Sequence, residues 1–139
     1  MVHVLIVEDD LSIADLLEEL LKADGFSVCG IVRSVQEAKD SVALRKPDFA
    51  VVDIRLAHGD LGTEVAANLR QTTDAGIIFS TGNSNDMVLM RSLGDAVMTK
   101  PYRLSDVGRG LKIIDEITRF GCTKLVFPRN FQLLGSVVA

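Results

Sequence analysis

The sequence is poor in the features that mark several classes of protein. Its 139 residues include only two cysteines, Cys29 and Cys122, whose separation matches no metal-binding or redox motif. No apolar run approaches the length of a membrane span, and no signal peptide is visible. These absences predict a protein of a reducing, cytoplasmic setting that does not associate with a membrane.

Clusters of basic residues, internal repeats and low-complexity segments are also absent. The formal net charge is -4, so the sequence offers no electrostatic attraction to nucleic acid. The apolar fraction of 47% and the charged fraction of 24% are ordinary for a globular protein. A chain of this length is expected to form one domain and to bury roughly two thirds of its unfolded surface.

Strand-like and helix-like patterns alternate along the chain. Continuous apolar runs such as residues 3–7 are typical of parallel strands that are buried on both faces. Strands are predicted at residues 3–7, 26–32, 49–54, 77–80 and 96–99. Helices are predicted at about residues 13–24, 34–45, 63–71, 86–93 and 105–119. Five strands, each followed by a helix, predict an α/β fold with a doubly wound parallel sheet.

Polar residues stand where four of the predicted strands end. Glu8 and Asp9 follow the first strand, Asp53 ends the third, and Thr81 and Lys100 follow the fourth and fifth. Ligands of doubly wound sheets bind beyond this edge, and Mg²⁺ prefers oxygen ligands such as carboxylates. Asp53 would share the metal and attack a phosphoryl group as nucleophile. Lys100 and the Thr81 hydroxyl would interact with the phosphoryl oxygens.

Each of these residues alone also has an ordinary structural explanation. Glu8 and Asp9 would be favourable at the positive end of a helix dipole, although Asp10 is better placed to cap that helix. A single Asp53 would more often be a solvated loop acid, and a single lysine is usually a surface residue. The joint pattern, at the ends of successive strands, favours a functional site.

At these residues the chain resembles the receiver domains of two-component response regulators. The matching segments are residues 4–10, 51–53, 79–82 and 100–102. The resemblance covers about residues 1–119 and leaves residues 120–139 as an apolar C-terminal extension. It implies a flavodoxin-like fold with a five-stranded parallel sheet in the order 2-1-3-4-5.

The resemblance also implies a function and assigns roles to residues. A histidine kinase or phosphotransfer protein is expected to phosphorylate the chain, which would then signal through protein–protein contact. Asp53 would be the phospho-acceptor, Thr81 the switch hydroxyl and Lys100 the lysine of the motif. Mg²⁺ would be held by Glu8, Asp9, Asp53 and the backbone carbonyl of Arg55. The peptide bond between Lys100 and Pro101 is typically cis in this family.

The sequence departs from the family pattern at the switch and near the acceptor. The switch aromatic is replaced by Val97, so signalling must use another element, and Tyr102 lies in the same region. Arg55 and Asn83 stand two residues after Asp53 and Thr81 and are expected to tune the phosphoryl lifetime. The Phe-x-Thr-Gly and Lys-Pro-Tyr runs look like an α-proteobacterial stress-pathway branch, except that Asn83 replaces its usual tyrosine.

Two other functions are compatible with parts of the pattern. An Mg²⁺-dependent phosphatase with an aspartyl nucleophile usually carries a second acid where this chain has Arg55. A phosphate-independent interaction module would not need the five site residues intact. We therefore expect that the chain is not an enzyme and catalyses only its own phosphorylation and dephosphorylation. We also expect no DNA-binding domain, since about twenty residues follow the last predicted helix.

The extension is unusually apolar for a linker. Lys124 and Arg129 are its only charged residues, and Pro128 and Gly135 divide it into short strand-like pieces. Such a segment would be an aggregation hazard if it were exposed. We expect a homodimer through residues 120–139 and the last helix, and packing within one chain is the alternative.

Overall fold

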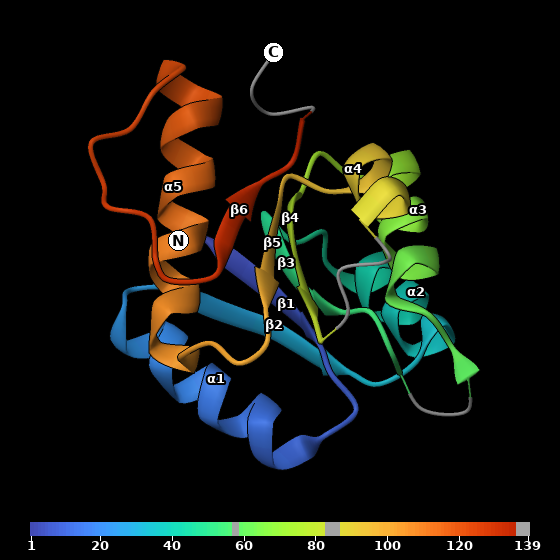
Figure 1. The fold of residues 1–139 in the computed structure, drawn as a ribbon. Coiled ribbons are helices and arrows are strands. Elements are labelled where there is room, and N and C mark those ends of the chain that lie inside the picture. The colour runs from blue at the N-terminus through green and yellow to red at the C-terminus, as the bar shows by residue number, and fades with distance from the viewer. Residues whose placement is uncertain (57–58, 83–86, 136–139) are drawn as a thin grey trace.

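The computed structural model describes residues 1–56, 59–82 and 87–135, which form one mixed sheet with helices on both faces (Figure 1). Within this described part, the sheet has six strands in the order β2-β1-β3-β4-β5-β6. The first five strands are parallel, and β6 pairs with β5 in the antiparallel direction. The strands are β1 (His3–Val7), β2 (Ser27–Val32), β3 (Phe49–Asp53), β4 (Gly76–Thr81), β5 (Ala96–Thr99) and β6 (Phe131–Leu133).

The expected α/β fold and the strand order 2-1-3-4-5 are thus confirmed, but the expected count of five strands omits β6. The Lys100–Pro101 peptide bond is cis, as expected.

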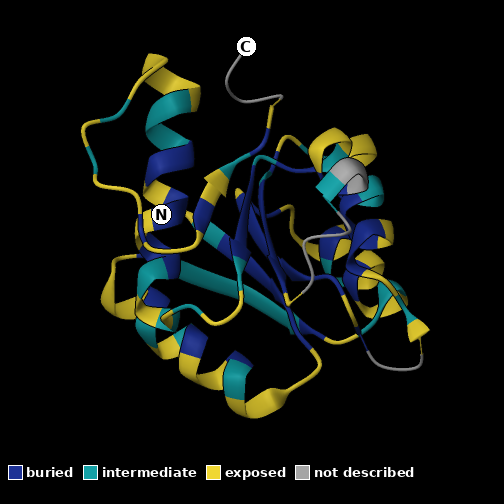
Figure 2. Ribbon diagram, in the orientation of Figure 1, coloured by how far each residue is buried: buried dark blue, intermediate teal, exposed yellow. Residues whose placement is uncertain are grey.

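The helices divide between the two faces of the sheet. They are α1 (Leu11–Ala23), α2 (Val35–Leu44), α3 (Gly62–Thr72), α4 (Met87–Leu93), the short 3₁₀ helix η3 (Leu104–Asp106) and α5 (Val107–Phe120). Side chains of α1 and α5 pack with one face of the strands, and those of α2, α3 and α4 pack with the other. Figure 2 shows the result, with the buried central strands β1, β3, β4 and β5 between helices that are exposed on their outer sides, while β2 is mostly half-buried.

Side-chain hydrogen bonds cap the first two helices at the residues that the sequence predicts. The Asp10 side chain caps α1 by accepting hydrogen bonds from the backbone nitrogens of Ser12 and Ile13. The Ser34 hydroxyl accepts from the Glu37 nitrogen at 3.1 Å. The Glu37 carboxylate accepts in return from the Arg33 nitrogen at 3.2 Å, one residue earlier than in a standard capping box.

The described part of the extension packs on its own domain at Pro128, Phe131 and Leu134, which are buried, whereas Phe120, Val126 and Phe127 stay exposed. β6 is held along β5 by hydrogen bonds from the Thr99 nitrogen to the Asn130 carbonyl and from the Leu134 nitrogen to the Asp95 carbonyl. The Phe131 ring lies against α5 at Gly110, where a Cβ atom would come within 3.0 Å of it. This arrangement is the alternative to the expected homodimer, and self-association of the chain stays a prediction.

We expect the extension to contribute to the stability of the domain. Phe131→Ala should lower the free energy of unfolding by about 3 kcal/mol, because it truncates a buried aromatic side chain. Val126→Ala, in the same extension but 75% exposed, is the matched control and should change it by less than about 0.5 kcal/mol. Urea denaturation of both variants measures the difference. Equal losses would contradict a packing role for Phe131.

Candidate functional site

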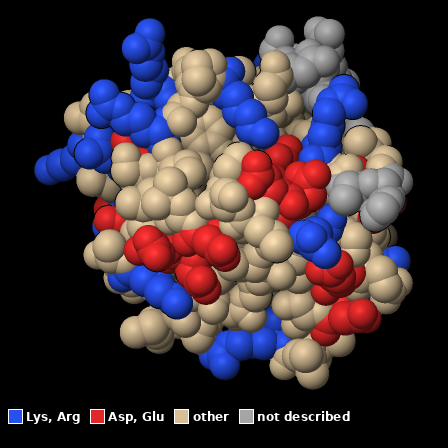
Figure 3. Space-filling model, turned by 90° about the horizontal axis from the view of Figure 1, so that it is seen from below, with Lys and Arg blue, Asp and Glu red and all other residues tan. Residues whose placement is uncertain are grey.

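The site is built at the edge of the sheet where β1 and β3 end. These strands are parallel neighbours, with Val7 opposite Val52, so the next residues, Glu8 and Asp53, reach the edge side by side. One carboxylate oxygen from each of Glu8, Asp9 and Asp53 lies within 4.8 Å of the others. Figure 3 views the molecule from below Figure 1, the side toward which β1 runs, and shows acidic side chains gathered on that face.

Glu8 and Asp9 differ in their surroundings. Glu8 is buried, and its backbone nitrogen donates to the Val32 carbonyl of β2 at 2.9 Å. Its carboxylate accepts a hydrogen bond from the Asp10 nitrogen at 3.2 Å, which orients it at the start of α1. Asp9 is exposed. The pair therefore offers one fixed carboxylate and one that solvent reaches.

Asp53 is held at the centre of the site. Its carboxylate is 3.2 Å from the Lys100 Nζ, and its other oxygen accepts from the Arg55 nitrogen at 3.2 Å. The loop after Asp53 passes so closely that a Cβ atom at Gly62 would lie 2.1 Å from the Asp53 carbonyl oxygen. Gly62 is thus a structural requirement of the site that the sequence-based prediction does not contain.

Thr81 and Lys100 complete the pocket from the ends of β4 and β5. The Lys100 backbone nitrogen donates to the Thr81 carbonyl at 2.8 Å, so the two residues are fixed relative to each other. Thr81 is buried, whereas 42% of the Lys100 side chain is exposed. Both residues line one hollow together with Glu8, Asp9 and Asp53. The structure therefore brings together all five residues expected at the strand ends.

Burial, and after it the neighbouring charges, set the electrostatics of the hollow. Burial raises the pKa of Glu8 from 4.5 to about 7. The hydrogen bond from the Asp10 nitrogen opposes this shift, and the negative charge of Asp53 adds to it. Burial alone would lower the pKa of Lys100, but the charges of Asp53 and Glu8 hold it above 10.5. Lys100 therefore stays cationic beside the acids.

Val97 stands at the position where a switch aromatic is expected, and Tyr102 follows in the loop after β5. Val97 is fully buried in β5, between β4 and β6. Tyr102 is partly buried, and its hydroxyl lies 2.6 Å from the Ser80 Oγ. Burial raises the pKa of Tyr102 above 10, although the contact with Ser80 opposes this shift. Ser80 pairs with Asp53 in the β3–β4 register and is absent from the sequence-based prediction of the site.

Of the two residues expected to tune the phosphoryl lifetime, the structure describes only Arg55. The Arg55 side chain is exposed, and Arg55 forms an isolated antiparallel bridge with Leu61. Asn83 lies outside the described residues.

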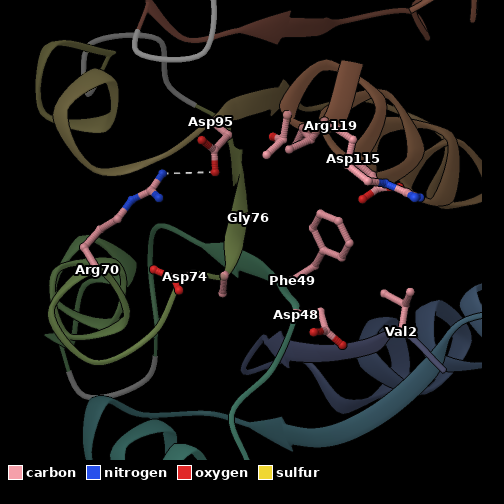
Figure 4. Close-up of a pocket in the computed structure, with 12 residues that line it drawn as sticks. Val2, Asp48, Phe49, Arg70, Asp74, Gly76, Asp95, Asp115 and Arg119 are labelled. Atoms are coloured by element: carbon pink, nitrogen blue, oxygen red, sulfur yellow. Dashed lines mark hydrogen bonds and ion pairs between the residues drawn. The ribbon is translucent and has the colours of Figure 1, made fainter. Parts of the chain in front are cut away.

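A second hollow lies at the opposite edge of the sheet, where β3 and β4 begin (Figure 4). Four aspartates line it, but Asp95 pairs with Arg70 at 3.0 Å and accepts from the Ile77 nitrogen at 2.8 Å. Asp115 likewise pairs with Arg119 at 2.7 Å. Arginines therefore neutralise part of this acidic group. Among the described residues, the cluster of three close carboxylates lies instead at the ends of β1 and β3.

Comparison with known proteins identifies the family of the chain. Residues 4–119 match the model of the response regulator receiver domain. The chain belongs to this receiver domain family. Receiver domains are regulatory phospho-acceptors of two-component systems and bind Mg²⁺ at an acidic pocket, and this chain has such a pocket.

The most similar relatives include proteins of bacterial gene regulation. The chain is 32% identical over 124 residues to the uncharacterized transcriptional regulatory protein YrkP of Bacillus subtilis, covering 85% of this chain and 50% of that protein. It is 30% identical over 116 residues to the KDP operon transcriptional regulatory protein KdpE of Escherichia coli, covering 81% and 51%. The chain thus spans about half the length of the curated relatives it matches.

Solved structures support the same family. The N-terminal domain of the nisin resistance regulator NsrR matches with a TM-score of 0.69 and 30% identity, covering 81% of this chain and 96% of that one. The receiver domain of Erythrobacter litoralis PhyR matches with a TM-score of 0.73 and 27% identity, covering 90% and 96%. These likenesses do not single out the α-proteobacterial branch. No helix in the described part of the chain is long and apolar enough to span a membrane.

The raised pKa of Glu8 predicts how the stability of the metal-free protein depends on pH. Between pH 4.5 and about 7, the folded state keeps a proton that the unfolded chain has released. The stabilisation from this proton is fully present below pH 4.5 and is lost as the pH rises toward 7. Glu8→Gln cannot ionise and should have a flatter stability profile in this window. Calorimetric melting with a chelator present measures both profiles, and identical profiles would contradict the shift.

Proposed function

We propose that Asp53 accepts a phosphoryl group from a histidine kinase or phosphotransfer protein and that the chain then signals through protein–protein contact. The observation that carries this proposal is the position of the Asp53 carboxylate. It lies 3.2 Å from the Lys100 ammonium and within 4.8 Å of oxygens from Glu8 and Asp9. Asp53 therefore faces a cation on one side and potential metal ligands on the other.

The residues present fit a bound Mg²⁺. Carboxylates are hard oxygen donors, and three of them converge here from two adjacent strands. Glu8, Asp9, Asp53 and the backbone carbonyl of Arg55 would hold the ion. When bound, Mg²⁺ would neutralise negative charge on the phosphoryl group. Burial is the main cause of the raised pKa of Glu8, and the charge of Asp53 adds to it; a divalent cation would relieve this part of the shift.

The chemistry of the other residues follows from their places. A carboxylate oxygen of Asp53 attacks phosphorus as the phosphorus–nitrogen bond of the donor phosphohistidine breaks. The electron pair of that bond stays on the ring nitrogen, so a donor ring protonated on its other nitrogen leaves as neutral histidine, and an acyl phosphate forms on Asp53. The Lys100 ammonium, paired with Asp53 before transfer, then pairs with a phosphoryl oxygen. The Thr81 hydroxyl donates a hydrogen bond to another phosphoryl oxygen. Arg55 and Asn83, which stand two residues after Asp53 and Thr81 in the sequence, set the lifetime of the acyl phosphate.

The proposal also divides the chain into two parts. We assign residues 1–119 to the receiver domain and residues 120–139 to a C-terminal extension. The chain catalyses only its own phosphorylation and dephosphorylation. A phosphatase acting on small esters would need a second acid near the nucleophile. Arg55 occupies the corresponding position, so the chain has no carboxylic acid there.

A labelling experiment tests the proposal. The protein is incubated with Mg²⁺ and a small acyl-phosphate donor, and a hydroxylamine-labile gain of one phosphoryl mass is sought by mass spectrometry. Wild type should gain the label, and Asp53→Asn should not, since an amide cannot form the acyl phosphate. Asp74→Asn, an exposed aspartate at the opposite edge, is the matched control and should label normally.

The metal and the alternatives are tested in the same experiment. A chelator should abolish labelling. Rapid release of phosphate from many donor molecules per chain would favour the phosphatase, and no label on wild type would favour a phosphate-independent module. Full labelling of Asp53→Asn at another residue would contradict the assignment of the acceptor.

A further inference from the structure

Three arginines from separate segments of the chain line one groove beside the C-terminal extension. Arg103 comes from the loop after β5, Arg109 from α5 and Arg129 from the loop before β6. All three are exposed. Figure 3 shows basic side chains gathered at the upper left of its view, and α5 and the extension lie on the left in Figure 1. We call this hollow the arginine groove.

The arginine groove carries positive charge that the surrounding residues do not neutralise. Asp106 is the only acid among its lining residues. Among the described residues, no ion pair is formed by Arg103, Arg109 or Arg129. This excess stands out in a chain whose net charge is -4. Guanidinium groups bind carboxylates in a bidentate manner, so the groove is suited to an anionic ligand.

The wall formed by the extension is fixed and partly apolar. The Asn130 side-chain amide donates to the Pro101 carbonyl at 2.7 Å and thereby ties the two sides of the groove together. The Phe131 nitrogen donates to the Pro128 carbonyl at 3.2 Å, which closes a turn. Phe127 stacks edge-on against Phe131 at 5.3 Å, yet 44% of Phe127 stays exposed. The groove therefore presents an aromatic surface next to its cations.

These observations favour a peptide over other anions. The exposed Phe127 offers an apolar contact that a free phosphate or carboxylate would not use. A long polyanion such as nucleic acid would also meet the negative field of the rest of the protein. A short acidic segment needs only the local positive charge. We propose that the arginine groove binds an acidic segment of a partner protein, with an apolar side chain of that segment packed against Phe127.

The proposal is independent of phosphorylation at Asp53 and is tested with the unphosphorylated full chain. The probe is a short fluorescein-labelled peptide of aspartate, glutamate and glycine around one central phenylalanine, and binding is followed by fluorescence anisotropy. Arg129→Gln should weaken binding by about threefold, as expected for loss of one exposed ion pair. The triple variant Arg103→Gln, Arg109→Gln and Arg129→Gln should weaken it by more than tenfold, roughly the product of the single losses.

Matched controls separate the groove from general electrostatics. Lys124→Gln removes one exposed positive charge from the same extension outside the groove and should leave affinity unchanged. A peptide with asparagine and glutamine in place of the acids should bind at least tenfold more weakly, because it cannot pair with the guanidiniums. Circular dichroism checks that each variant is folded.

Three results would overturn the proposal. One is an equal loss of affinity in Lys124→Gln and Arg129→Gln. Another is tighter binding of a DNA oligonucleotide than of the acidic peptide. The third is self-association of the wild type, in sedimentation, that the triple variant loses, because this would assign the groove to a second copy of the chain.

Discussion

The crowding of three carboxylates at one edge of the sheet is the constraint on which the rest of the site depends. β1 and β3 are buried parallel neighbours, so their register brings Glu8 and Asp53 to the same place. Burial removes water that would otherwise stabilise the charges, and the pKa of Glu8 rises to about 7. Lys100 offsets part of the charge at 3.2 Å from Asp53. The apolar sheet holds these groups together despite their repulsion, which is the situation that a divalent cation relieves.

The strand that precedes Lys100 is also the strand that the extension covers. β5 lies between β4 and β6, so Val97 is enclosed in the sheet instead of facing solvent. Asn130 accepts a hydrogen bond from Thr99 and donates one to the Pro101 carbonyl, on either side of Lys100 along the chain. The extension is therefore attached to the backbone that positions the lysine. Pro101, which accepts the hydrogen bond from Asn130, also lines the arginine groove and directly follows Lys100 of the acidic site.

The sequence predicts the part of the structure that depends on periodicity and on strand ends. Parallel strands of one sheet direct their carboxyl ends to one edge, so the sequence alone places Glu8, Asp53 and Lys100 together. The packing of the extension could not be predicted, because a strand of only three residues can pair with its own sheet or with another chain. The Ser80–Tyr102 contact depends on how the loop after β5 folds back, and composition does not encode that path.

The central claim is that the crowded acids form a binding site for a divalent cation whose occupation requires Glu8 to lose its proton. Calorimetric titration of the full chain with Mg²⁺, in two buffers with different ionisation enthalpies, measures both the binding and the protons released. The account predicts one ion per chain, with proton release that is large below pH 7 and shrinks as the pH rises above the pKa of about 7. Glu8→Gln should bind more weakly and release fewer protons. Binding of Mg²⁺ below pH 7 without proton release, or no binding, would contradict the account.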